Sequence, residues 1–160
     1  MKHLICTLFA FLLSFFAIQA KDDGNVLNYE INCGGSAVQG YSLVKVKVTV
    51  KKAKDATDDL AKRCAVHGVV FRGYAGGQGC VSQPPLAGSA MSEQQYSDFY
   101  KPFFEKGGAC AGYCTVVDGS MLITKVDKQY VASFVVNVAR DRLRKDLESA
   151  GVIRKLSSGF

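Results

Sequence analysis

One stretch decides the fold class of this chain: Val44-Lys45-Val46-Lys47-Val48-Thr49-Val50-Lys51. Valines occupy every second position, and lysines or a threonine fill the positions between them. Because side chains of a β-strand point alternately to opposite faces, this pattern predicts a strand with one buried and one solvated face. A solvated face is typical of antiparallel or mixed sheets, since parallel sheets are usually covered on both sides. We therefore expect a mostly antiparallel sheet.

Other segments show the same alternation or a helical period. Four further strands are expected from alternation, at residues 27–33, 113–118, 121–126 and 130–138. A short apolar run at residues 69–71 is expected to be a buried strand. Three helices are expected: one begins at Asp55 and ends at Gly68, and one begins with the capping pair Ser92 and Gln95. The last begins at Asp141 and ends at Gly151. Together these elements predict a two-layer α+β domain, with three helices on one face of a mostly antiparallel sheet of five or six strands.

The first twenty residues, MKHLICTLFAFLLSFFAIQA, predict a secretory signal peptide. A lysine precedes an unbroken apolar stretch, and a small residue precedes the charged Lys21-Asp22-Asp23, which favours cleavage after Ala20. The apolar stretch is too short for stable membrane insertion. We expect residues 1–20 to be the leader, residues 21–160 to form a single globular domain, and the protein to be exported, either periplasmic or secreted.

Charge and composition exclude some classes of partner. The formal net charge is +6, and the basic residues are spread along the chain without a stripe of interleaved lysines and aromatics. A nucleic-acid-binding protein would be expected to carry such a stripe. The sequence therefore predicts no nucleic-acid partner, and no motif in it calls for a cofactor.

Five cysteines follow the expected leader, and disulfides are the normal outcome for such cysteines in an oxidising compartment. Five is an odd number, so at least one cysteine stays outside an internal bond. Cys110 and Cys114 lie close in sequence around a glycine and are the favoured local pair. The pairing is open in general, and the candidate disulfide cysteines are Cys110, Cys114, Cys64 and Cys80.

The same residues could carry chemistry, and two alternatives are weighed. Cys64 and His67 are three residues apart on a helix and, with Cys110 and Cys114, would make a Cys3His zinc set. A thiol–disulfide enzyme using Cys110 and Cys114 is the other alternative, although their spacing is three residues where the thioredoxin motif has two. The simpler interpretation is a structural disulfide and a core histidine, with no catalytic residues and no metal site.

The segment Gly73–Ala90 differs from the rest of the chain. It contains five glycines and the pair Pro84-Pro85, which predict a long loop. Long loops in small domains are more often functional than short connections. We expect this loop to contact a partner, with Arg72, Tyr74 and Gln83 at its borders as the binding residues.

Two resemblances bear on the function. The segments CAVHGVVFRGY (64–74) and LRKDLESAGVI (143–153), with the ending LSSGF (156–160), resemble a group of uncharacterised secreted proteins of Bacteroidetes. The order of elements is more loosely similar to small envelope domains, namely the amino-terminal domain of TolB and the Lpp20-like lipoproteins. These resemblances imply an envelope-associated domain and transfer no catalytic or ligand-binding residue.

The sequence thus predicts an exported, non-enzymatic domain that binds a protein or envelope component through the 73–90 loop. The alternative is a small thiol–disulfide or metal-dependent enzyme that uses Cys110 and Cys114.

Overall fold

A computed structural model describes residues 27–77 and 79–156. The expected leader, residues 1–20, lies outside the described residues. The sheet contains five strands: β1 (Tyr29–Cys33), β2 (Ser42–Val50), β3 (Cys114–Val116), β4 (Leu122–Val126) and β5 (Gln129–Val138). The helices are α1 (Asp58–Phe71), α2 (Met91–Gln95), α3 (Ser97–Phe103) and α4 (Arg140–Ser149), with short 3-10 turns η1 (Ala53–Asp55) and η2 (Ala109–Tyr113).

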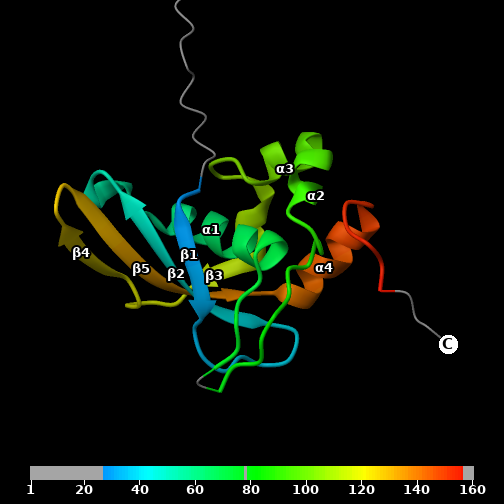
Figure 1. Cartoon of the computed structure of the whole chain (residues 1–160), viewed down its shortest axis with the longest axis horizontal. Helices are drawn as coiled ribbons and strands as arrows, with labels where there is room; N and C mark the ends of the chain where they lie inside the picture. The colour runs from blue at the N-terminus through cyan, green and yellow to red at the C-terminus, as the bar shows by residue number, and fades with distance from the viewer. Residues whose placement is uncertain (1–26, 78, 157–160) are drawn as a thin grey trace, which may run out of the picture.

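The sheet is antiparallel throughout, with the order β1-β2-β5-β3. β4 pairs with β5 on the same side as β3, so β3 and β4 together form one interrupted edge (Figure 1). Where the ladder is interrupted, the Ser120 hydroxyl accepts a hydrogen bond from Val135 N at 3.1 Å and lies 3.3 Å from Val135 O. The side chain thus supplies the polar partner that a regular strand would supply from its backbone.

One face of the sheet is buried and the other is solvated, as the alternation predicted. Val44, Val46 and Val48 of β2 are buried, and the intervening Lys45 and Lys47 are not. The partner strand β5 buries Ala132, Phe134, Val136 and Val138 on the same side. The two-layer α+β class and the mostly antiparallel sheet are confirmed.

Helix α1 lies on the buried face and differs from the expected helix at both ends. It begins after Thr57, whose side-chain oxygen accepts a hydrogen bond from Leu60 N at 3.2 Å, and not at Asp55. It continues through Gly68 to Phe71, so the buried strand expected at 69–71 is wrong. Gly68 serves a different purpose, because a Cβ there would collide with the side chain of Ile31 on β1. The glycine lets helix and sheet approach closely.

The aromatic segment after the long loop forms two short helices that pack on α1. The turn between α2 and α3 falls at Tyr96, whereas Pro102 lies in the last turn of α3. The expected capping role of Ser92 is wrong, since its hydroxyl donates to Ala87 O at 3.3 Å. Tyr100 packs edge-on against Phe71 of α1, with ring centroids 4.8 Å apart. The aromatic residues therefore belong to the core.

Helix α4 follows β5 directly and ends as predicted. Asp141 is its second residue and not its cap; the cap is Ala139, two positions earlier. At the other end, Gly151 has φ +73°, Gly151 N donates to Glu148 O, and Val152 N donates to Leu147 O. This is the Schellman arrangement that satisfies the last helical carbonyls. Because α4 follows β5 directly, its first residue, Arg140, lies beside the carboxyl end of β5.

Candidate functional site

Residues 73–77 and 79–83 of the 73–90 loop form a short antiparallel ribbon. Tyr74 and Gln83 exchange two backbone hydrogen bonds of 2.9 Å, and Gly77 and Cys80 exchange two more of 3.1 and 2.9 Å. Gly73 begins the ribbon with φ +65°, and a Cβ there would collide with the carbonyl oxygen of Gln83. Only glycine combines that backbone conformation with so close an approach.

The second half of the loop completes the end of α1. A helix leaves its last carbonyls without intrahelical partners. Leu86 N donates to Val69 O at 3.2 Å, and Ala87 N donates to Val70 O at 2.9 Å. Leu86 is also part of the core, at 5% exposed. These contacts hold the second half of the loop against the end of α1, and the ribbon extends from this attachment.

A disulfide joins this ribbon to the segment between β1 and β2. Cys33, the last residue of β1, is bonded to Cys80, and their Cα atoms are 6.2 Å apart. This separation is normal for a disulfide. Cys80 was among the expected disulfide cysteines, whereas Cys33 was not singled out. Ser36 adds a hydrogen bond of 3.3 Å to Gly79 O across the same contact.

Between the two joined segments lies a cleft of about 370 Å³, the size of a small-ligand or peptide side-chain site. Three of its lining residues are apolar and exposed, with Val38 69% exposed, Tyr41 43% and Val81 85%, and polar Ser36, Gln39 and Ser82 lie beside them. Leu43 contributes to the wall. Such a gathering of exposed apolar side chains around a concave surface is typical of a binding site.

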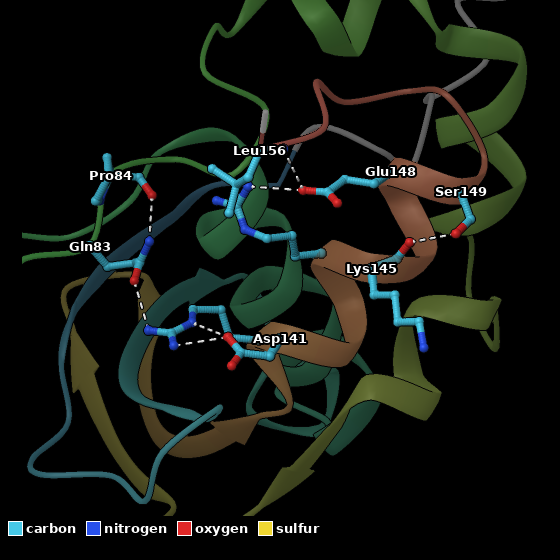
Figure 2. A network of polar contacts seen from close by, with 9 residues as sticks. Gln83, Pro84, Asp141, Lys145, Glu148, Ser149 and Leu156 are labelled. Atoms are coloured by element: carbon cyan, nitrogen blue, oxygen red, sulfur yellow. Dashed lines mark hydrogen bonds and ion pairs between the residues drawn. The ribbon is translucent and has the colours of Figure 1, made fainter. Parts of the chain in front are cut away.

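One wall of the cleft carries a polar network centred on Arg140. Arg140 Nη1 donates to Gln83 Oε1 at 3.0 Å, and Nη2 lies 2.9 Å from Asp141 Oδ1. Gln83 Nε2 in turn donates to Pro84 O at 3.0 Å (Figure 2). Asp141 N donates to Gly40 O at 3.0 Å, so the start of α4 is attached to the other segment as well. The network places an arginine, a carboxylate and an amide side by side, with donors and acceptors both available.

The structure brings together two of the three residues predicted for partner binding. Tyr74 and Gln83 both line the cleft. Arg72 lies elsewhere: its guanidinium is 4.0 Å from the Tyr29 ring centroid and donates to Tyr29 O at 2.6 Å. Arg72 therefore contacts β1 and does not line the cleft. Sequence reasoning did not find Arg140 or Tyr41. Arg140 reaches the cleft because β5 pairs with β2, and Tyr41 reaches it because the Cys33–Cys80 bond joins the end of β1 to the loop.

The other three cysteines in the described part of the chain are free and buried, which corrects the expected bond between Cys110 and Cys114. Both lie around η2 and face the core: Cys114 Sγ lies 3.7 Å from Lys62 O of α1 and 3.9 Å from Cys110 O. Cys64 is also free. Burial raises the pKa of the Cys110 thiol to about 11 and that of Cys64 and Cys114 to about 12. All three thiols therefore stay protonated near neutral pH, whereas a nucleophilic cysteine must be a thiolate.

His67 is a partly buried histidine that links three elements. Its Nδ1 lies 2.6 Å from the Tyr29 hydroxyl of β1, and its Nε2 lies 3.0 Å from Glu93 Oε1 of α2. Burial lowers the pKa of His67 and is only partly offset by Glu93. Burial also raises the pKa of Tyr29, so the tyrosine is not an activated nucleophile. Within residues 27–77 and 79–156, no group of three or more His, Cys, Asp or Glu side chains is placed to hold a metal ion.

The fold and the cleft thus define a small, disulfide-linked α+β domain with a concave, partly apolar surface site. No protein-family model, no curated protein and no solved structure matches the chain. The resemblance to secreted Bacteroidetes proteins and to small envelope domains stays a prediction.

Proposed function

We propose that the protein is an exported, non-enzymatic domain that binds a protein partner in the cleft that residues 34–41 form with residues 73–77 and 79–83, which we name the stapled cleft. The observation that carries the proposal is the junction of these segments by Cys33–Cys80 around a cavity whose lining includes exposed apolar residues and Arg140. The stapled cleft includes the first half of the loop predicted to bind a partner.

The chemistry of the cleft favours a polypeptide over a small anion. Arg140 is paired with Asp141, so the wall has little net charge to attract an isolated phosphate or carboxylate. Gln83 and Arg140 present a hydrogen-bonding edge beside apolar side chains, which matches a main chain with alternating apolar residues. A partner segment in extended conformation would place an apolar side chain among Val38, Tyr41 and Val81.

The disulfide supports both binding and export. A cross-link between two loops reduces the conformational freedom that binding would otherwise remove, and so favours affinity. Disulfides persist in oxidising compartments and are rare in the cytosol. In the part of the chain that the structure describes, no helix is long and apolar enough to cross a membrane.

The alternative enzyme that uses Cys110 and Cys114 receives less support. Both thiols are buried and carry raised pKa values, and neither lines the stapled cleft. An enzyme of this class needs a reactive, accessible thiolate.

A displayed library of short random peptides, selected on the immobilised oxidised protein, tests the proposal. The selected peptides should share an apolar residue flanked by main-chain hydrogen-bonding positions, and their affinity should fall about tenfold in Arg140→Gln. That loss corresponds to one hydrogen-bonded charged contact. Tyr41→Ala should weaken binding to a similar degree.

Arg154→Gln is the matched control, because Arg154 is exposed and lines a different depression beside Val152. It should leave the affinity unchanged. Selected peptides that bind Arg140→Gln and Tyr41→Ala as tightly as the unaltered protein would refute the stapled cleft as the binding site.

A further inference from the structure

The edge formed by β4 is unusually apolar for a solvated strand. All five residues of β4 are exposed, with Leu122 at 67%, Val126 at 48% and Ile123 at 38%. The preceding Val117 and Met121 are also exposed large apolar residues. Among the described residues, β4 pairs only with β5, so its outer row of backbone groups has no strand partner.

The opposite edge of the sheet is protected, and the contrast is informative. On β1, Arg72 donates a hydrogen bond to Tyr29 O, and the disulfide fixes Cys33 at the other end. The exposed side chains of β1, Glu30 and Asn32, are polar. Proteins usually block free edges in these ways, because an open apolar edge is a template for another strand.

β4 also stands clear of the helical layer. It lies at the far end of the sheet from α4, and none of the helices among the described residues covers it (Figure 1). A second strand can therefore approach its edge without meeting a helix.

We propose that β4 is a self-association edge, where a second copy of the chain pairs antiparallel through a two-fold axis at Thr124. The register follows from the sequence Leu122-Ile123-Thr124-Lys125-Val126. It places Thr124 opposite Thr124 of the second copy, and Leu122 opposite Val126 twice. Leu122 and Val126 share the solvated face with Val131 of β5. The pairing therefore places these apolar side chains of one copy beside the same side chains of the other.

Charge complementarity favours a second copy as the occupant. Asp118 lies in the turn before β4, and Lys128 lies in the turn after it. Both are exposed, and neither forms an ion pair within the described part of the chain. Antiparallel pairing brings the Asp118 end of each strand to the Lys128 end of the other. The same two contacts then form twice, as a symmetric interface requires.

The interface is small, which sets the expected affinity. Stable complexes bury about 1,200–2,000 Å² in total, and a five-residue strand pair buries less. We therefore expect a reversible dimer with a dissociation constant of about 10–100 micromolar, within the range that sedimentation equilibrium measures.

Sedimentation equilibrium across a range of concentrations tests the proposal. The protein should dimerise, and Thr124→Lys should weaken the dimer about tenfold or more, because it places two like charges opposite each other at the axis. Asn32→Lys on the β1 edge is the matched control and should dimerise like the unaltered protein. A protein that stays monomeric overturns the proposal, and an extended segment of a different protein would then be the candidate partner of β4. Equal dimerisation of Thr124→Lys and the unaltered protein overturns it too.

Cross-linking tests the register independently of affinity. With oxidised glutathione as the oxidant, Thr124→Cys should form a covalent dimer, because directly opposite residues lie within disulfide range. Val126→Cys should not, since the two substituted positions would be about 13 Å apart along the pair. The reverse result would overturn the two-fold axis at Thr124.

Discussion

Removal of the Cys33–Cys80 bond is the perturbation whose cost follows most directly from the structure. The bond closes a loop with a sequence separation of 47 residues. In the chain-entropy model, a loop of that length restrains the unfolded chain by about 4 kcal/mol at 25 °C. The double variant Cys33→Ser, Cys80→Ser should therefore lose about 3–4 kcal/mol of unfolding free energy. For a domain of this size the midpoint of thermal unfolding should fall by about 10 °C.

Urea denaturation followed by far-ultraviolet circular dichroism measures this loss, since the chain has no tryptophan to report on unfolding. Cys110→Ala is the control: it removes a buried sulfur but no cross-link, and should cost only about 1 kcal/mol. Reduction of the unaltered protein should reproduce the double variant. A loss below about 1 kcal/mol in the double variant would refute the reasoning, because the two loops would then be held together without the bond.

Three further predictions follow from the described contacts. Burial lowers the pKa of His67 below 6.5, so the unfolded chain binds the proton more readily than the folded chain. The free energy of unfolding should therefore fall as the pH drops through about 6.5. Denaturation series at several pH values should show this dependence, and His67→Gln should flatten it. Gly73→Ala should cost about 2 kcal/mol or more by urea denaturation, because a Cβ there collides with Gln83, whereas Gly88→Ala, at a similar φ of +69° in open space, should cost about 1 kcal/mol. Native-state alkylation followed by intact mass should leave the three free thiols unmodified, and rapid labelling of any of them would contradict their burial and raised pKa values.

Local patterns predicted much of the fold because the responsible physics is local. The alternation in residues 44–50 predicted the buried and solvated faces of β2, and Gly151 with Val152 predicted the end of α4. Gly68 misled the prediction for a clear reason. A glycine often ends a helix, but here the absence of a Cβ serves packing against Ile31, which lies 37 positions earlier in the chain.

The candidate site was only half predictable for the same reason. The glycine and proline content of residues 73–90 identified one wall, with Tyr74 and Gln83. The other wall depends on which cysteine meets Cys80 and on where β5 delivers Arg140. Both are consequences of strand order, and no periodicity in the sequence encodes strand order directly.

The central claim is that a polypeptide binds in the stapled cleft, and a nuclear magnetic resonance titration tests it most directly. A library-selected peptide is added to the isotope-labelled, oxidised protein, and the backbone amide shifts are followed. The account predicts that the largest shifts fall in residues 34–41, in residues 73–77 and 79–83 and at Arg140, and that they disappear when the disulfide is reduced. Shifts concentrated along β4, or equal shifts in the oxidised and reduced protein, would contradict it.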